Sequence, residues 1–158
     1  MPHVFRRVLI GLGVVLLQWL VFSHLRLWGA FADVVLLYVA FVALRYGRVA
    51  GMVTGFTSGL LMDIVTPGTP LGLFMMLKTL LGFGIGFFRT EQGENIRLYP
   101  WQSFLGALLV AVVHNGLMVI ILALDNQTRT HFLIAGLWFG SALYTAFVAF
   151  IASLYRPR

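Results

Sequence analysis

The sequence contains no cysteine and very few charged residues. Only 10% of its 158 residues are Asp, Glu, Lys or Arg, whereas 60% are hydrophobic, compared with about 45–50% apolar residues in an ordinary soluble domain. The lack of cysteine excludes disulfides, thiolate metal sites and cysteine nucleophiles. The lack of charge leaves no polar shell for a soluble core, so we expect the whole chain to be a membrane domain.

The sequence also has few residue patterns that would indicate nucleic-acid binding or catalysis. The net charge is +6, but no dense basic patch occurs on a soluble segment, so we expect no nucleic-acid binding. The sequence has no deep pair of carboxylates, no plausible serine, histidine and acid constellation, and no H-E-x-x-H motif. We therefore predict a protein that is not an enzyme, with no catalytic residues, cofactor or metal site.

Apolar segments are what the sequence has in abundance. They predict an all-α integral membrane protein, a single domain over residues 1–158 with six transmembrane helices in one bundle. The predicted helices cover residues 8–22, 31–44, 49–65, 71–88, 101–124 and 132–154. Spanning the bilayer core takes about 20 helical residues, so the second segment is short unless its flanks join it.

The arginines predict the orientation of these helices. The N-terminus, the second and fourth loops and the C-terminus hold eight arginines, whereas the other three loops hold two. Because cytoplasmic loops collect Lys and Arg, both termini are expected in the cytoplasm. The remaining loops, including the turn at residues 66–70, would then face outward.

The third and fourth predicted helices each carry small residues at four-residue spacing. The rows are Gly47, Gly51, Gly55 and Gly59, which Asp63 continues, and Lys78, Gly82 and Gly86. In lipid, small residues on one helix face allow two backbones to approach closely. The two rows therefore predict a helix-packing seam within an antiparallel hairpin.

Asp63 and Lys78 are the acid and the base of this hairpin. One interpretation is a buried polar pair that fixes the register of the two helices, and the other is a polar site near the outer leaflet. The spacing leaves open whether Asp63 contacts Lys78 or backbone groups of the turn. A proton or ion pathway through Lys78 and His114 is a third hypothesis, which requires a water-filled cavity between them.

Three other polar residues stand out in apolar surroundings. His114 and Asn115 lie midway along the fifth predicted helix, where they can hydrogen-bond to another helix, line a pathway or bind a ligand. Asp33 lies at the start of the second predicted helix, where a carboxylate complements the positive end of the helix dipole. For Asp33 we expect a capping role.

Residues 27–89 resemble the rod shape-determining protein MreD family. The residues that carry the resemblance are Leu-Trp-Gly-Ala-Phe-Ala-Asp33, Gly-Phe-Thr-Ser-Gly-Leu-Leu-Met-Asp63, Pro70-Leu-Gly72 and Gly82-Phe-Gly-Ile-Gly86. The family often has proline before its acid, where this chain has Ala32. The resemblance implies a non-catalytic scaffold of the bacterial inner membrane that takes part in cell elongation, rod shape and peptidoglycan synthesis. It implies MreC as the direct partner, with MreB, RodA and a class B penicillin-binding protein in the wider complex.

The same fold is similar to that of the S-components of energy-coupling-factor vitamin transporters, which gives the alternative function. A substrate-binding S-component should have a closed polar or aromatic cavity near the outer leaflet, roofed by the turn at residues 66–70. S-components typically dock their transducing subunit through an Ala-x-x-x-Ala face on the first helix. Residues 8–22 contain no alanine, which favours the scaffold over the transporter.

Overall fold

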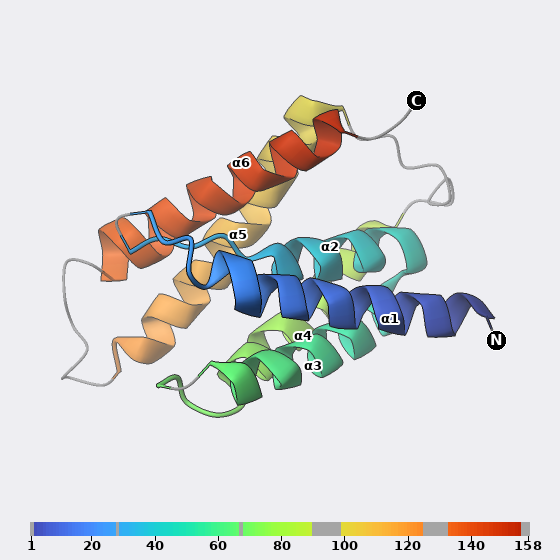
Figure 1. Ribbon diagram of the computed structural model, residues 1–158, viewed down its shortest axis with the longest axis horizontal. Helices are drawn as coiled ribbons and strands as arrows, with labels where there is room; N and C mark the ends of the chain where they lie inside the picture. The colour runs from blue at the N-terminus through green and yellow to red at the C-terminus, as the bar shows by residue number, and fades with distance from the viewer. Residues whose placement is uncertain (1, 28, 67, 90–98, 125–132, 156–158) are drawn as a thin grey trace. The chain divides into compact units, whose positions relative to one another are not determined.

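The structure is a computed structural model that describes residues 2–27, 29–66, 68–89, 99–124 and 133–155 (Figure 1). The described residues form six α-helices with three short π- or 3-10-helical segments. The elements are α1 (Pro2–Leu17), η1 (Gln18–Phe22), α2 (Val34–Tyr46), α3 (Arg48–Val65), α4 (Leu73–Ile85), η2 (Gly86–Phe88), α5 (Pro100–Leu122), η4 (Leu133–Gly140) and α6 (Ser141–Leu154). The predicted all-α class is confirmed.

Four of the described helical stretches are long and apolar enough to cross a membrane. They are Phe5–Phe22, Arg48–Val65, Pro100–Leu122 and Gly136–Leu154. The two shorter apolar stretches are Val34–Tyr46 and Leu73–Phe88. At about 1.5 Å per residue, the 13-residue α2 is shorter than the roughly 30 Å of bilayer hydrocarbon.

Several helix ends differ from the sequence-based expectation. The first helix starts at Pro2, not at residue 8, and the second covers 34–46, not 31–44. Hydropathy marks the part of a helix that lies in lipid, whereas the helical backbone continues through polar residues such as Arg6 and Arg7. The fourth starts at Leu73 because Gly72, with φ +91°, ends the preceding turn in the left-handed region.

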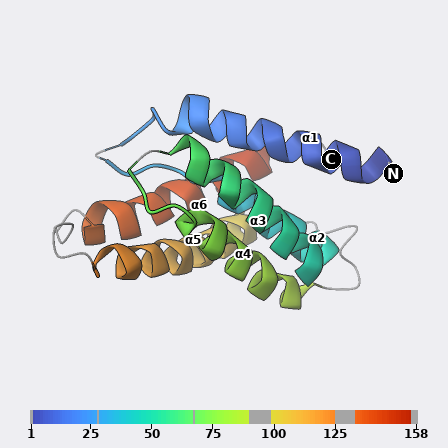
Figure 2. The same cartoon turned by 90° about the horizontal axis from the view of Figure 1, so that it is seen from below.

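The chain forms two compact units, so the single-domain organisation stays a prediction. The first comprises Met1–His24 and Val34–Asn95, and the second Leu25–Asp33 and Ile96–Arg158. In the first unit α3 and α4 lie side by side as a hairpin (Figure 2), and α2 packs on both. In the second unit α5 packs on η4 and α6.

The α3–α4 hairpin is held together by backbone contact. A Cβ atom added at Gly59 would lie 2.5 Å from Met75 Cα, and one added at Gly55 would lie 2.6 Å from the carbonyl carbon of Lys78. Both distances are too short for any side chain larger than hydrogen. The two backbones are therefore as close as helices can approach, which maximises dispersion contact between them.

Candidate functional site

The predicted packing seam divides into two kinds of glycine. Gly51, Gly55, Gly59, Gly82 and Gly86 lie at backbone contacts, because an added Cβ at each would collide with the facing backbone. Gly47 differs, because it alone separates α2 from α3 and has a φ of +89°. Its role is to make this sharp connection, since a positive φ strains every residue with a Cβ.

Asp63 caps a helix other than its own. It lies near the end of α3 and is 6% exposed. Its two carboxylate oxygens accept hydrogen bonds from the N–H groups of Phe74 and Met75, each at 3.0 Å. These groups belong to the first turn of α4 and lack acceptors within that helix. A carboxylate at this place also complements the positive end of the α4 dipole.

The sequence left open what Asp63 contacts, and the structure gives it backbone partners in α4. Lys78 lies one turn further along α4 and is fully buried. Its Nζ lies 5.7 Å from the ring centroid of Phe74, within the range of a cation–π contact. The hairpin therefore holds both predicted polar residues, and Asp63 acts by fixing the start of α4.

In the second unit, His114 and Asn115 link α5 to η4. His114 Nδ1 lies 3.0 Å from Asn115 Oδ1, and Asn115 Nδ2 donates to the carbonyl oxygen of Trp138 at 3.4 Å. The Nε1–H of Trp138 in turn donates a hydrogen bond to the carbonyl oxygen of Val112 at 3.0 Å. Gly116 makes room for the indole, because an added Cβ would lie 3.1 Å from it. The two elements are joined by polar and aromatic contacts at once.

Asp33 ends a short segment that docks on α6 within the second unit. The Asp33 N–H donates to Thr145 Oγ1 at 3.0 Å, and the Phe31 N–H donates to Ser141 Oγ at 3.1 Å. Both hydroxyls are buried on α6. Helix α2 begins at the next residue, Val34, and the capping role of Asp33 stays a prediction.

Sequence reasoning missed Gln18, which is 2% exposed. Its Oε1 accepts a hydrogen bond of 2.8 Å from the N–H of Val34, the first residue of α2. The amide of Gln18 therefore satisfies one of the donors that a helix start leaves without an intrahelical acceptor. The available signal was a lone amide inside the apolar stretch of residues 8–22.

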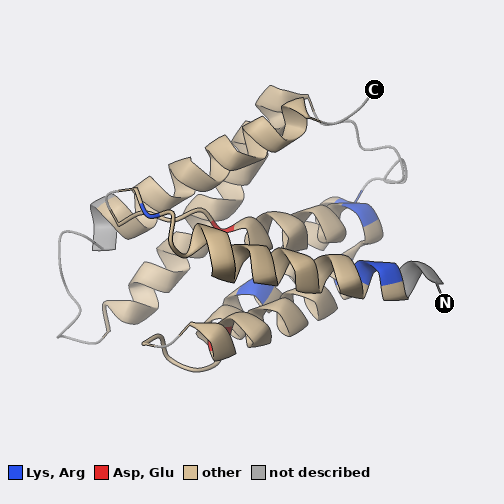
Figure 3. Cartoon of the chain, in the orientation of Figure 1, with Lys and Arg blue, Asp and Glu red and all other residues tan. Residues whose placement is uncertain are grey.

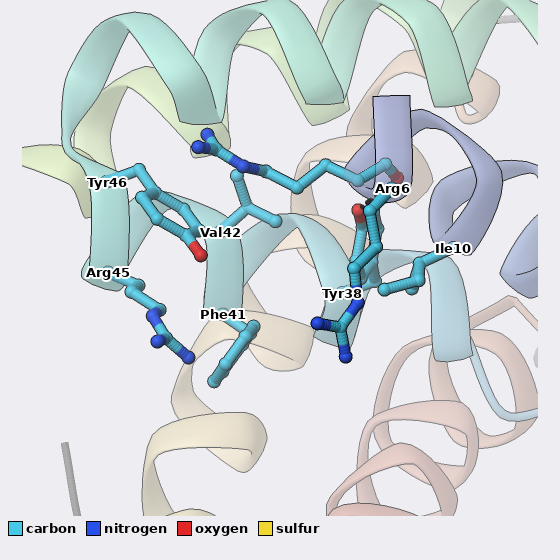
Figure 4. Close-up of a pocket in the computed structure, with 8 residues that line it drawn as sticks. Arg6, Ile10, Tyr38, Phe41, Val42, Arg45 and Tyr46 are labelled. Atoms are coloured by element: carbon cyan, nitrogen blue, oxygen red, sulfur yellow. Dashed lines mark hydrogen bonds between the residues drawn. The ribbon is translucent and has the colours of Figure 1, made fainter. Parts of the chain in front are cut away.

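Sequence reasoning also missed a cavity of about 400 Å³ between α1 and α2 (Figure 4). Its lining residues are Arg6, Arg7, Ile10, Tyr38, Phe41, Val42, Arg45 and Tyr46. Tyr38 donates a hydrogen bond from its hydroxyl to the carbonyl oxygen of Arg7 at 2.9 Å. The available signal was the recurrence of arginine at the start of the first helix and at the end of the second.

Aromatic rings position two of the guanidinium groups at this cavity. Arg7 Cζ lies 3.9 Å from the ring centroid of Tyr46, and Arg45 Cζ lies 5.4 Å from the same centroid. Arg45 Cζ also lies 5.9 Å from the ring centroid of Phe41. The described lining residues thus combine positive charge with aromatic faces and include no acid.

Among the residues that the structure describes, no group of three His, Cys, Asp or Glu side chains could hold a metal ion. The described part of the chain is instead an assembly of apolar helices in which a few polar side chains are buried in hydrogen-bonded positions. Such helices, with their backbone groups satisfied internally, define an integral membrane protein.

Comparison with known proteins identifies the family. The model of the family "ECF-type riboflavin transporter, S component" matches residues 8–155, which include parts of all six helices. The chain belongs to this family. No curated protein and no solved structure matches it.

This match overturns the prediction that the chain belongs to the MreD family. The predicted cell-elongation function, and the predicted partners MreC, MreB, RodA and the class B penicillin-binding protein, are wrong with it. The resemblance rested on residues 27–89, whose glycine rows and Asp63 build a hairpin. The family match extends over the sequence on both sides of that region, and it supports the transporter alternative.

Proposed function

We propose that the protein is the substrate-binding subunit of an energy-coupling-factor transporter and that its substrate is riboflavin. The observation that carries this proposal is the family match over residues 8–155. The subunit would capture the vitamin without catalysing a reaction, and ATP hydrolysis would take place in partner subunits. The all-helical fold and the apolar spans support a role within the bilayer.

The distribution of arginine supports an orientation with both termini in the cytoplasm of a bacterium. In the first unit, the segments of α1 and α2 that are coloured for Lys and Arg lie at the same end of these two helices (Figure 3). They include Arg6, Arg7 and Arg45, which line one cavity, and Arg48 and Arg89 lie at the same end beside Gly86 and Gly47. Because arginine-rich ends stay in the cytoplasm, we place this end inside and the turn at residues 66–70 outside.

This orientation separates the vitamin from the arginine cavity. A vitamin taken up from outside must first reach the outer end, where Asp63 holds the start of α4 and so fixes the turn before it. The cavity between α1 and α2 lies at the end that carries Arg6 and Arg45, which in this proposed orientation faces the cytoplasm. We therefore assign riboflavin capture to the outer half of the protein and leave the arginine cavity for a different ligand.

Helix α1 is the surface that we propose for docking of the transducing subunit. Of its span Phe5–Phe22, 11% is buried, against 22% to 39% in the other three long spans. Leu9, Gly13, Leu16 and Leu20 recur at three- and four-residue spacing and are exposed. An added Cβ at Gly13 meets nothing within 4 Å. Glycine there would allow the close helix approach that alanines provide in other S-components.

Riboflavin fluorescence provides the direct test. The protein is purified in mild detergent and titrated with riboflavin, and we expect quenching that saturates at one vitamin per chain. Thiamine, which differs in ring system, should not compete. Absence of saturable quenching in protein that remains monodisperse would contradict the proposed substrate.

The docking surface is tested separately by Gly13→Leu. We expect this variant to bind riboflavin normally but to lose co-purification with the transducing subunit and the ATPases, because leucine holds the two helices apart. Gly106→Leu is the matched control, since Gly106 on α5 is also free of neighbours within 4 Å. Equal assembly of the two variants would place the docking surface elsewhere.

A further inference from the structure

The cavity between α1 and α2 has a polar rim and an apolar floor. Its rim comprises Arg6 and Arg7 from the start of α1 and Arg45 from the last turn of α2. Ile10 lies one turn deeper on α1, and Phe41 lies one turn deeper on α2. Figure 4 shows the labelled side chains from both helices around this space. A ligand that fits both parts must carry a charged group and an apolar portion.

The residues of the rim favour an anionic ligand with several oxygen acceptors. Arg45 Nε is buried and has no hydrogen-bond acceptor among the described residues. A buried N–H group without an acceptor is unfavourable by the desolvation free energy of that group. The planar guanidinium group matches phosphate oxygens in a bidentate geometry. The rings of Phe41 and Tyr46 flank this group, because their centroids lie 5.9 Å and 5.4 Å from Arg45 Cζ.

The apolar residues of the floor favour a ligand that is partly embedded in the bilayer. Ile10 is 45% exposed although it lines the cavity, so the apolar floor continues onto the surface of α1. The same side of α1 carries a further exposed apolar side chain, Leu17, two turns along from Ile10. An acyl chain could therefore leave the cavity along α1 without meeting a polar group. Soluble phosphate esters would use only the rim.

We propose that this cavity binds the phosphate group of an anionic phospholipid of the cytoplasmic leaflet. The phosphate lies among Arg6, Arg7 and Arg45 and accepts hydrogen bonds from their guanidinium groups, and the start of an acyl chain covers Ile10 and Phe41. Basic pockets between helices at the cytoplasmic surface bind anionic headgroups by this combination of charge and hydrogen bonding. The lipid thereby joins α1 to α2 at their inner ends, independently of the vitamin.

Native mass spectrometry of the purified protein tests this assignment. The protein is equilibrated with equal amounts of phosphatidylglycerol and phosphatidylcholine, and the lipids retained by each chain are counted. We expect one retained phosphatidylglycerol, and a loss of about tenfold in its retention in Arg45→Gln, as expected for one strong charge-assisted contact. Equal retention of the two lipids by the unaltered protein would overturn the proposal.

Arg48→Gln is the matched control. Arg48 belongs to the same cytoplasmic end and its Cζ lies 4.7 Å from the ring centroid of Phe87, but it does not line the cavity. We expect it to retain phosphatidylglycerol like the unaltered protein. Equal losses in Arg45→Gln and Arg48→Gln would show an effect of general surface charge and overturn the site. Size-exclusion chromatography of both variants shows whether each remains folded and monodisperse, so this test does not depend on the outcome of the riboflavin titration.

Two further experiments distinguish the lipid from other sources of negative charge. If inorganic phosphate stabilises the protein in phosphatidylcholine alone and displaces phosphatidylglycerol, the site belongs to a soluble phosphate and the lipid assignment fails. Glu91 and Glu94 lie outside the described residues. If Glu91→Gln with Glu94→Gln increases phosphatidylglycerol retention, these carboxylates compete for the arginines of the cavity and the proposal is overturned. We expect neither effect.

Discussion

The two helix pairs of the first unit are packed by opposite means. In the α3–α4 pair, glycines bring backbone against backbone, and an added Cβ at Gly55 or Gly59 would collide with α4. In the α1–α2 pair, arginine and tyrosine side chains hold the helices and leave a cavity of about 400 Å³. Backbone contact gives a hairpin with no space for a ligand, whereas contact through long side chains leaves space that a ligand can fill.

The difference has a physical origin in the membrane. Lipid tails are as apolar as leucine, so burial of apolar side chains supplies little drive for two helices to associate in lipid. Close packing and hydrogen bonds must supply it instead. The α3–α4 hairpin uses both, because Asp63 adds two hydrogen bonds to its glycine contacts. The α1–α2 pair relies on side-chain contacts such as that of Tyr38 with Arg7.

Gly55→Ala should break the hairpin and have the largest effect. The new Cβ would lie 2.6 Å from the carbonyl carbon of Lys78 and 2.9 Å from Thr79 N, so the backbones must separate. We expect the free energy of unfolding in detergent to fall by about 3 kcal/mol, the upper part of the range for overpacking. Gly84→Ala is the control on the same hairpin, because its Cβ meets nothing within 4 Å. Equal stability of the two variants would contradict the backbone contact.

Asp63→Ala should have the next largest effect. It leaves the N–H groups of Phe74 and Met75 without their acceptors, so we expect a loss of about 2 kcal/mol in the free energy of unfolding, as for hydrogen bonds to a charged group. Asp63→Asn, which keeps one acceptor oxygen, should lose less. The measurement is chemical or thermal unfolding in a fixed detergent.

The charge-swapped double variant separates a helix cap from an ion pair. If Asp63 acts by capping α4, then Asp63→Lys with Lys78→Asp should not recover stability, since a lysine at position 63 presents no acceptor to the two N–H groups. Recovery in the double variant beyond the sum of the single changes would show direct interaction between the two side chains. That result would restore the buried-pair interpretation.

The hairpin was predictable from sequence because its cause is local. Four-residue glycine spacing places Gly51, Gly55 and Gly59 on one face of α3, and a short turn brings the next helix back against this face. Gly47 was placed in the packing row by its four-residue spacing, but spacing alone does not reveal that α2 ends at Tyr46 and α3 begins at Arg48, with Gly47 at a positive φ between them.

The cavity and the family were not predictable in the same way. The cavity needs Arg6 and Arg45 to meet, and nothing in the local pattern specifies that α1 lies beside α2 at that height. The family was misjudged because the motifs within residues 27–89 indicate only how helices pack against each other. Different families of membrane proteins use the same small residues for such packing. Helix α1, where alanine was sought, instead exposes Gly13.

The contact between α5 and η4 in the second unit is of a third kind, because the side-chain amide of Asn115 joins the two elements. Asn115→Leu removes its hydrogen bond to the Trp138 carbonyl oxygen and its contact with His114. We expect a loss of about 1 kcal/mol, slightly above the average of about 0.6 kcal/mol for polar contacts between membrane helices. Thr57→Val is the control, since Thr57 is exposed and bonds only within α3. Equal effects would assign Asn115 no role in joining the two elements.

Tyr38→Phe should have the smallest effect. It removes the hydrogen bond from the Tyr38 hydroxyl to the Arg7 carbonyl oxygen and keeps the ring that lines the cavity. One polar contact between membrane helices contributes about 0.6 kcal/mol on average, so the free energy of unfolding in detergent should fall by no more than about 0.6 kcal/mol. A pair held by several weak side-chain contacts tolerates the loss of one, whereas a pair held by backbone contact does not tolerate one added methyl group. If Tyr38→Phe destabilised the protein as much as Gly55→Ala, the α1–α2 pair would be as tightly determined as the hairpin and the contrast between them would be wrong.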